Sequence, residues 1–209
     1  MRVTPLDHPM ARHLLGQMRD AATGHQALRG LATRLATLLA IEATRDLPTQ
    51  ADSTTGWAGT VAVERVAEAS VMLVPVLRAG LGLLDGALAV LPGARVGVIG
   101  ARRNEATLQA EVYCERIGEG LEGSTALLLD PMLATGGTAI AAVARLRAAG
   151  CTRIKGLFLV AAPEGLDALG EAHPGIDVHV AAVDERLNEV GYILPGLGDA
   201  GDRLFGVTG

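Results

Sequence analysis

Residues 125–150 constrain the fold of this chain more than any other segment. The unbroken apolar run from Ala126 to Leu129 indicates a buried strand. This strand ends at Asp130 and Pro131, because proline cannot donate to a ladder. A turn of small residues follows, and an alanine-rich helix begins at once and closes at Gly150, a residue type common just after a helix. The segment therefore predicts a strand, a turn and a helix in direct succession.

The same alternation continues along the chain after residue 70. The predicted strands cover 71–77, 95–99, 126–129, 154–160 and 176–183, and the predicted helices cover 81–91, 138–150 and 166–173. Strands that alternate with helices favour a parallel sheet wrapped in helices. In such a sheet, ligands sit beyond the carboxyl ends of the strands, so the loops at those ends are the candidate sites.

The first 70 residues are predicted to be mainly helical. Leucines recur at helical spacing from His25 to Arg45, and Thr23 with Gln26 has the pattern of a capping box. Residues 48–59 are polar and indicate a hairpin or a loop. We predict a single domain over residues 1–209, with a helical region at 1–70 and an α/β core at 71–209.

Composition argues against several classes of function. The formal net charge is −5 and no basic block is present, so neither a nucleic-acid nor a membrane surface is expected. No stretch reaches the roughly 20 apolar residues of a membrane span, and the N-terminus lacks the apolar region of a secretory signal. Cys114 and Cys151 lie too far apart for a zinc motif or a disulfide framework. We therefore expect a reduced, cytoplasmic protein.

The turn after Asp130 has the features of a phosphate site. Thr135, Gly136, Gly137 and Thr138 stand where free main-chain N–H groups and the helix dipole favour an anion. No lysine follows the glycines, so this is not the phosphate loop of an NTPase. The carboxylate of Asp130 would repel a phosphate and instead suits a neutral diol or a magnesium shell. A sugar phosphate is the predicted ligand, and a turn that binds nothing is the alternative.

Three further loops follow predicted strands. Arg78 ends the first strand, where it could bind a phosphate or pair with a surface acid. Arg102 and Arg103 follow the second strand. Five glycines occur between Gly191 and Gly206, and glycines allow the main chain to approach a ligand closely. Such a loop could bind a flat heterocycle by hydrogen bonds from its main-chain N–H and C=O groups. The alternative is that these residues form an irregular C-terminal tail.

Together these segments resemble the uracil phosphoribosyltransferase family at that family's own spacing. The matching stretches are 74–82, 103–108, 130–138, 160–165 and 191–202, with His8-Pro9 and 42–46 near the N-terminus. The resemblance implies a type I phosphoribosyltransferase-like parallel sheet flanked by helices, with an N-terminal helical extension and a C-terminal base-binding loop. It also implies that uracil and 5-phosphoribosyl 1-diphosphate (PRPP) become UMP and diphosphate in pyrimidine salvage.

The resemblance assigns roles to individual positions. Arg78 and Arg103 would hold the diphosphate, and Asp130 would meet the ribose hydroxyls. Asp199 would lie beside the ribose as a catalytic residue, with Arg103 as the second. The further residues that would bind PRPP are Pro131, Met132, Leu133, Ala134, Thr135, Gly136, Gly137 and Thr138, of which Leu133 to Thr138 would wrap the 5′-phosphate. The residues that would contact uracil are Ile193, Gly198, Asp199 and Ala200. Mg²⁺ is expected to arrive with PRPP, and no residues are predicted to bind a resident metal.

Some features depart from the family pattern, and some stay open. Residues 109–116 lack the prolines and paired aromatic residues expected in that flap or hairpin, and Ile41 replaces a frequent tyrosine. An enzyme for another base is one alternative, although the Gly-Tyr-Ile loop at 191–193 argues against the wider purines. A non-catalytic regulator that binds PRPP or UMP is a second alternative, which the negative net charge disfavours. The apolar N-terminal helix predicts a homodimer or larger assembly. GTP activates some members of the family, but this sequence does not decide whether GTP binds here.

Overall fold

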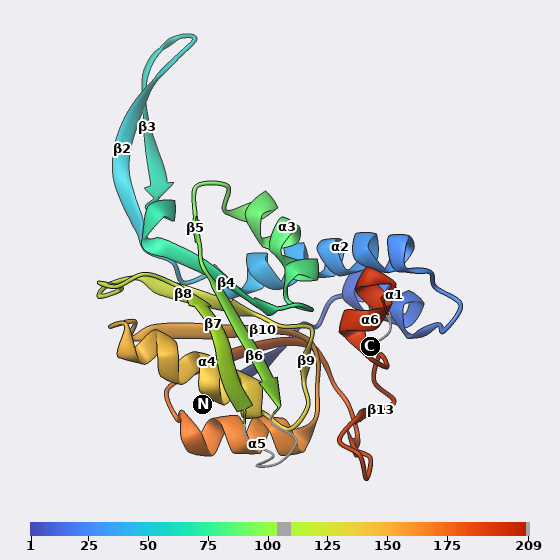
Figure 1. Ribbon diagram of the computed structural model, residues 1–209. Helices are drawn as coiled ribbons and strands as arrows, with labels where there is room; N and C mark the ends of the chain where they lie inside the picture. Colours follow the sequence, from blue (N-terminus) through green and yellow to red (C-terminus); the bar gives the residue numbers. More distant parts are fainter. Residues whose placement is uncertain (104–109, 208–209) are drawn as a thin grey trace.

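The computed structural model describes residues 1–103 and 110–207 of the chain, and its centre is a mostly parallel sheet (Figure 1). The main path of this sheet has the order β1-β11-β10-β8-β4-β6-β7. Its strands are β1 (Arg2–Pro5), β4 (Val71–Leu77), β6 (Val98–Arg103), β7 (Ala110–Arg116), β8 (Thr125–Leu129), β10 (Arg153–Ala161) and β11 (Asp177–Val183). The short strand β5 (Arg95–Val96) pairs with β4, and β9 (Met132–Leu133) pairs with β10. The edge strand β7 runs antiparallel to β6 and forms the hairpin expected near residues 109–116.

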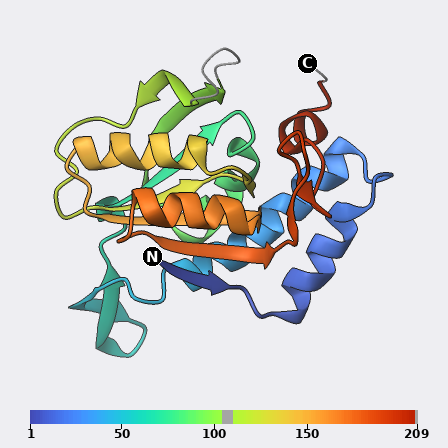
Figure 2. The same ribbon diagram turned by 90° about the horizontal axis from the view of Figure 1, so that it is seen from below.

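Helices cover both faces of the sheet (Figures 1 and 2). One layer contains α1 (Pro9–Arg19), α2 (His25–Ala43) and α3 (Leu81–Val90), and the other contains α4 (Gly137–Ala148) and α5 (Pro163–Ala172). Side chains alternate along a strand, so Leu127 and Leu129 of β8 join the core under α2, whereas Ala126 and Leu128 join the core under α4. Burial on both faces explains the unbroken apolar run in the sequence.

The N-terminal region contributes more than helices. Strand β1 pairs in parallel with β11 and so extends the central sheet. Strands β2 (Thr49–Gly56) and β3 (Gly59–Val66) form an exposed hairpin that projects from the body of the protein (Figure 1). The predicted capping box is wrong: Gly24 is the N-cap of α2. Thr23 therefore lies before the helix start, and its hydroxyl donates instead to the carbonyl oxygen of Gln17 at 2.8 Å.

Most of the predicted strands and helices after residue 70 are confirmed, with bounds that shift by a few residues. The expectation that the chain's last strand ends at residue 183 is wrong. Strands β12 (Arg186–Leu187) and β13 (Ile193–Leu194) form a short antiparallel pair after it, and helix α6 (Ala200–Phe205) follows. Within the described residues, no helix combines the length and the apolar character needed to cross a membrane.

Candidate functional site

The predicted phosphate turn lies at the start of α4 and encloses a small cavity of about 80 Å³. Gly136 is the N-cap of the helix with a φ of 83°, a conformation that favours glycine. Among the described residues, no side chain caps α4, so the first main-chain N–H groups of the helix are available to an anion. The residues that line the cavity are Asp130, Met132, Leu133, Ala134, Thr135, Gly136, Gly137, Thr138 and Ala139.

Helix α5 supports this turn from behind. The N–H of Ala162 donates to the carbonyl oxygen of Leu133 at 2.9 Å, which continues the pairing of β9 with β10. A Cβ at Gly165 would clash with the carbonyl oxygen of Ala134, and a Cβ at Gly136 would lie 3.0 Å from the carbonyl oxygen of Gly165. The two glycines therefore allow the turn and α5 to pack main chain against main chain.

The carboxyl group of Asp130 lies at the end of β8 and has an unusual protonation equilibrium. Desolvation by burial raises its pKa to about 7, and this effect outweighs the opposing hydrogen bond from the N–H of Met132. In the ligand-free protein, Asp130 is therefore close to its titration midpoint at neutral pH. A diol that donates hydrogen bonds to this carboxylate would favour its ionised form.

The raised pKa of Asp130 makes a prediction for stability. The folded protein binds a proton more tightly than the unfolded chain, whose ordinary value is 3.8, so stability falls as pH rises toward 7. As pH rises from about 4 to about 8, the free energy of unfolding of Asp130→Asn should increase relative to that of the wild type by about 2–4 kcal/mol. Urea unfolding in phosphate-free buffers measures the difference. A difference that does not change with pH would contradict the assignment.

Arg78 follows β4 in a turn packed against the end of β8. A Cβ at Gly80 would clash with the carbonyl oxygen of Leu129, so this turn lies directly beside the strand that carries Asp130. The Leu77–Arg78 peptide bond is cis. The guanidinium of Arg78 is half exposed and pairs with Asp202 of α6 at 3.2 Å. Arg78 therefore forms a salt bridge in the ligand-free protein, which was the alternative role. Within the described part of the chain, its remaining guanidinium donors have no partner and could bind a ligand.

The glycine-rich C-terminal segment returns to the same place. Asp199 is the N-cap of α6, and its Oδ1 accepts from the N–H of Asp202 at 2.9 Å. A Cβ at Gly201 would lie 3.9 Å from the Cβ of Ala79, which places the start of α6 against the Arg78 turn. The Arg78 turn therefore lies beside both the end of β8, which precedes the phosphate turn, and the start of α6.

The main chain of this segment offers unused hydrogen-bonding groups. The N–H groups of Asn188 and Glu185 donate to the carbonyl oxygens of Tyr192 and Leu194, the neighbours of Ile193. Because hydrogen bonds alternate along an antiparallel pair, the main chain of Ile193 faces away from β12. Within the described residues, the N–H groups of Gly198 and Ala200 have no partner either. These groups can donate to, or accept from, a planar ligand.

Sequence reasoning missed the side chains that hold this segment. Arg19 and Asp184 form an ion pair behind it, and Arg203 donates to the carbonyl oxygen of Leu197. Asp184 directly follows β11, so the rule that sites lie at the carboxyl ends of strands could have identified it. Arg19 lies in α1, 165 residues away from Asp184, and nothing local in the sequence relates the two.

One predicted site residue is only partly placed. Strand β6 ends at Arg103, at the same edge of the sheet as the other site loops, but its side chain lies outside the described residues, as do residues 104–109. Its predicted role in binding diphosphate therefore stays a prediction.

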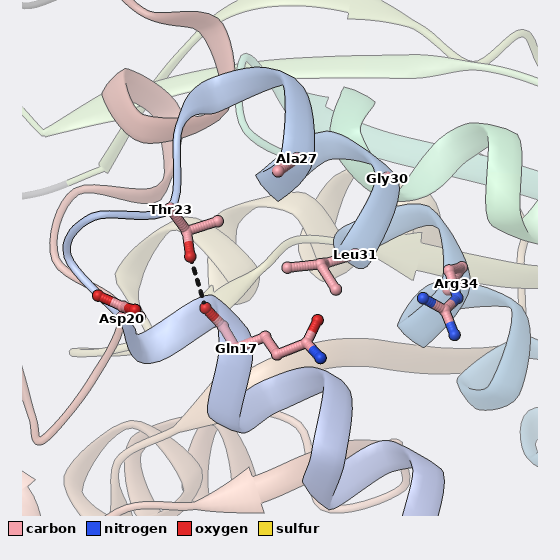
Figure 3. Close-up of a pocket in the computed structure, with 7 residues that line it drawn as sticks. All are labelled: Gln17, Asp20, Thr23, Ala27, Gly30, Leu31 and Arg34. Carbon is pink, nitrogen blue, oxygen red and sulfur yellow. Dashed lines mark hydrogen bonds between the residues drawn. The ribbon is translucent and has the colours of Figure 1, made fainter.

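A wider hollow of about 440 Å³ lies between α1 and α2 (Figure 3). Its lining residues are Gln17, Asp20, Thr23, Ala27, Gly30, Leu31 and Arg34. None of the predicted substrate-binding residues is among them. The smaller cavity at the start of α4, by contrast, is lined by Asp130 and the predicted phosphate turn.

Comparison with known proteins agrees with this geometry. The family model for uracil phosphoribosyltransferase matches residues 5–207. The chain is similar to the AQ2163 protein from Aquifex aeolicus, with 40% identity, 99% of each chain covered and a TM-score of 0.94. A hypoxanthine-guanine phosphoribosyltransferase from Bacillus anthracis shares the fold, with 12% identity and a TM-score of 0.50 over 77% of this chain and 80% of that one. The protein is therefore a phosphoribosyltransferase that belongs to the uracil phosphoribosyltransferase family.

Proposed function

We propose that this enzyme transfers the phosphoribosyl group of PRPP to N1 of uracil and releases UMP and diphosphate. The observation that carries the proposal is the contact of the C-terminal segment with the Arg78 turn, through Arg78–Asp202 and Gly201–Ala79. The C-terminal segment offers main-chain groups suited to a pyrimidine, and the Arg78 and phosphate turns offer groups suited to PRPP. The contact brings the first next to the second. A pyrimidine presents carbonyl oxygens and an N–H, which match the free main-chain groups of Ile193, Gly198 and Ala200.

The proposed binding mode divides PRPP among three turns. The turn at residues 133–138 holds the 5′-phosphate, and Asp130 accepts hydrogen bonds from the ribose hydroxyls. Arg78 exchanges Asp202 for the diphosphate, which enters with Mg²⁺ as part of the substrate. Holding both substrates in one crevice supplies the entropic part of catalysis.

The proposed chemistry assigns the two charges that develop in the transition state to opposite partners. Breaking the bond between the anomeric carbon and the diphosphate leaves positive charge on the ribose and negative charge on the leaving group. Arg78 and Arg103 stabilise the leaving group, together with the Mg²⁺ that the substrate carries. Asp199 stabilises the ribose through its second carboxylate oxygen, because the first is bound to the N–H of Asp202.

Incubation with Mg²⁺, PRPP and single free bases tests the proposal. The bases are uracil, cytosine, thymine, adenine, guanine and hypoxanthine, and chromatography identifies the nucleotide formed. We expect UMP from uracil and little product from the other bases. A purine nucleotide as the main product would contradict the proposal.

Arg78→Ala should weaken PRPP binding by about tenfold to a hundredfold, because a charge-assisted contact with the diphosphate is lost. The fold should be retained, since the side chain of Arg78 is 55% exposed. Calorimetric titration with PRPP and Mg²⁺ measures the effect. Arg12→Ala is the control, because it removes a similarly exposed arginine from an ion pair with Asp7. Unchanged affinity in Arg78→Ala would count against the diphosphate role.

Cytoplasmic location and homo-oligomeric assembly stay predictions for this chain.

A further inference from the structure

A partly buried ion pair holds the segment proposed to bind the base. Arg19, the last residue of α1, donates to Asp184 through two bonds, Nη2 to Oδ1 at 2.6 Å and Nη1 to Oδ2 at 3.0 Å. The two side chains are only 26% and 4% exposed. A two-bond pairing of a planar guanidinium with a carboxylate fixes the orientation of both groups as well as their distance.

This ion pair binds both main-chain groups of Gly196. Arg19 Nη1 donates to the carbonyl oxygen of Gly196 at 2.8 Å, and the N–H of Gly196 donates to Asp184 Oδ2 at 2.9 Å. Gly196 has a φ of 62°, and a Cβ there would clash with the carbonyl oxygen of Ile193. The position therefore requires glycine, and the peptide groups around it are fixed by a residue from α1 and a residue from the end of β11.

The next residue is fixed as well. Arg203 Nη1 donates to the carbonyl oxygen of Leu197 at 2.7 Å and to that of Met18 at 2.8 Å. The chain between Ile193 and Gly198 is thus bound at two successive residues by side chains from outside that stretch. Ile193 and Gly198, two of the three residues proposed to meet the base, lie at the two ends of this stretch.

Stability alone does not explain such an arrangement. Desolvation largely cancels the attraction within a buried ion pair, and well-packed apolar side chains often stabilise a fold equally well. What the Arg19–Asp184 pair supplies is direction, because apolar contacts cannot fix the orientation of a peptide group. Sites that must hold a ligand in one geometry depend on such supporting hydrogen bonds.

We propose that Arg19 and Asp184 are positioning residues for base recognition: through Gly196 they set the distance between the main-chain groups of Ile193 and Gly198. The inference rests on the proposed function, since it assumes that this segment contacts the base. It predicts that loss of the ion pair weakens recognition of the base but leaves recognition of the phosphoribosyl group unchanged.

Binding of UMP and of ribose 5-phosphate separates these two effects without using catalysis. UMP carries the base, whereas ribose 5-phosphate presents only the sugar and phosphate. By calorimetry, we expect Arg19→Met to weaken UMP binding at least about tenfold and ribose 5-phosphate binding less than about twofold. Arg19→Lys keeps the charge beside Asp184 but lacks the planar fork, so its affinity for UMP should lie between those of the wild type and Arg19→Met. In steady-state assays, Arg19→Lys should raise KM for uracil and leave KM for PRPP unchanged.

Lys155→Met is the matched control. Lys155 also joins a helix end to the sheet, because its Nζ donates to the carbonyl oxygen of Ala43 at 2.6 Å and pairs with Asp46. Like Arg19→Met, the Lys155→Met variant therefore loses bonds to an aspartate and to a main-chain carbonyl. Unlike Arg19, Lys155 does not contact the base-binding segment. Its affinities for UMP and ribose 5-phosphate should match those of the wild type.

The outcomes distinguish the inference from the function on which it rests. Equal weakening of both ligands in Arg19→Lys and Arg19→Met, or unchanged UMP affinity in both, would overturn the inference and leave the proposed function standing. A wild-type protein that binds UMP no more tightly than ribose 5-phosphate would overturn both.

Discussion

Asp199→Asn is expected to lower kcat by about a hundredfold to a thousandfold, with KM for uracil nearly unchanged. The reason is that the carboxylate is proposed to stabilise positive charge that appears on the ribose only in the transition state. Asparagine has the same shape but no charge. Steady-state kinetics with uracil and PRPP, at saturating Mg²⁺, measures both constants.

The substitution leaves the local structure intact, which makes the result interpretable. Asparagine caps helices about as well as aspartate, so the bond from the N–H of Asp202 to residue 199 should persist. Asp20→Asn is a matched control, because the Oδ1 of Asp20 accepts from the N–H of Ala22 at the same distance of 2.9 Å. Equal losses in kcat and in uracil affinity for Asp199→Asn would contradict a role confined to the transition state.

The parts of the site that the sequence predicted share one property: they depend on local chemistry. The strand at 126–129 is recognisable because burial on both faces requires an unbroken apolar run. Asp130 and the turn at 135–138 follow that strand directly, so the strand-end rule places them without any tertiary information. The resemblance of the same stretches to one family then supplied the roles.

The parts that the sequence did not predict depend on contacts between distant residues. Helix α6 has six residues, too few for helical periodicity to be recognised. The capping box failed because α2 begins after Gly24, one residue later than the pattern assumed, and the hydroxyl of Thr23 donates instead to the carbonyl oxygen of Gln17 in α1. The partners of Arg19 and Arg203 are main-chain groups and a carboxylate reached only after folding. Propensity and periodicity carry no information on such pairs.

Gly198→Val is expected to abolish measurable uracil binding. The proposed reading of the base requires the main chain at residue 198 to touch the planar ligand, and a branched side chain would occupy that space. Within the protein, a Cβ at Gly198 would lie 3.5 Å from Arg203 Cδ, an ordinary contact, so the first side-chain carbon meets no clash. The steric conflict should therefore fall on the ligand. Titration with UMP and with ribose 5-phosphate measures the effect, and the second ligand should still bind.

The conformation of Gly198 requires a control for backbone strain. Its φ is 70°, which valine adopts only at a cost of roughly 1–3 kcal/mol. Gly118→Val carries the same kind of strain, because Gly118 has a φ of 72° and open space around the Cβ position. If strain alone weakened the protein, both variants would lose thermal stability and ligand affinity to a similar extent. If the main chain of Gly198 reads the base, Gly118→Val should bind UMP like the wild type, whereas Gly198→Val should not. A Gly198→Val enzyme with normal UMP affinity would rule out recognition of uracil by the main chain at this position.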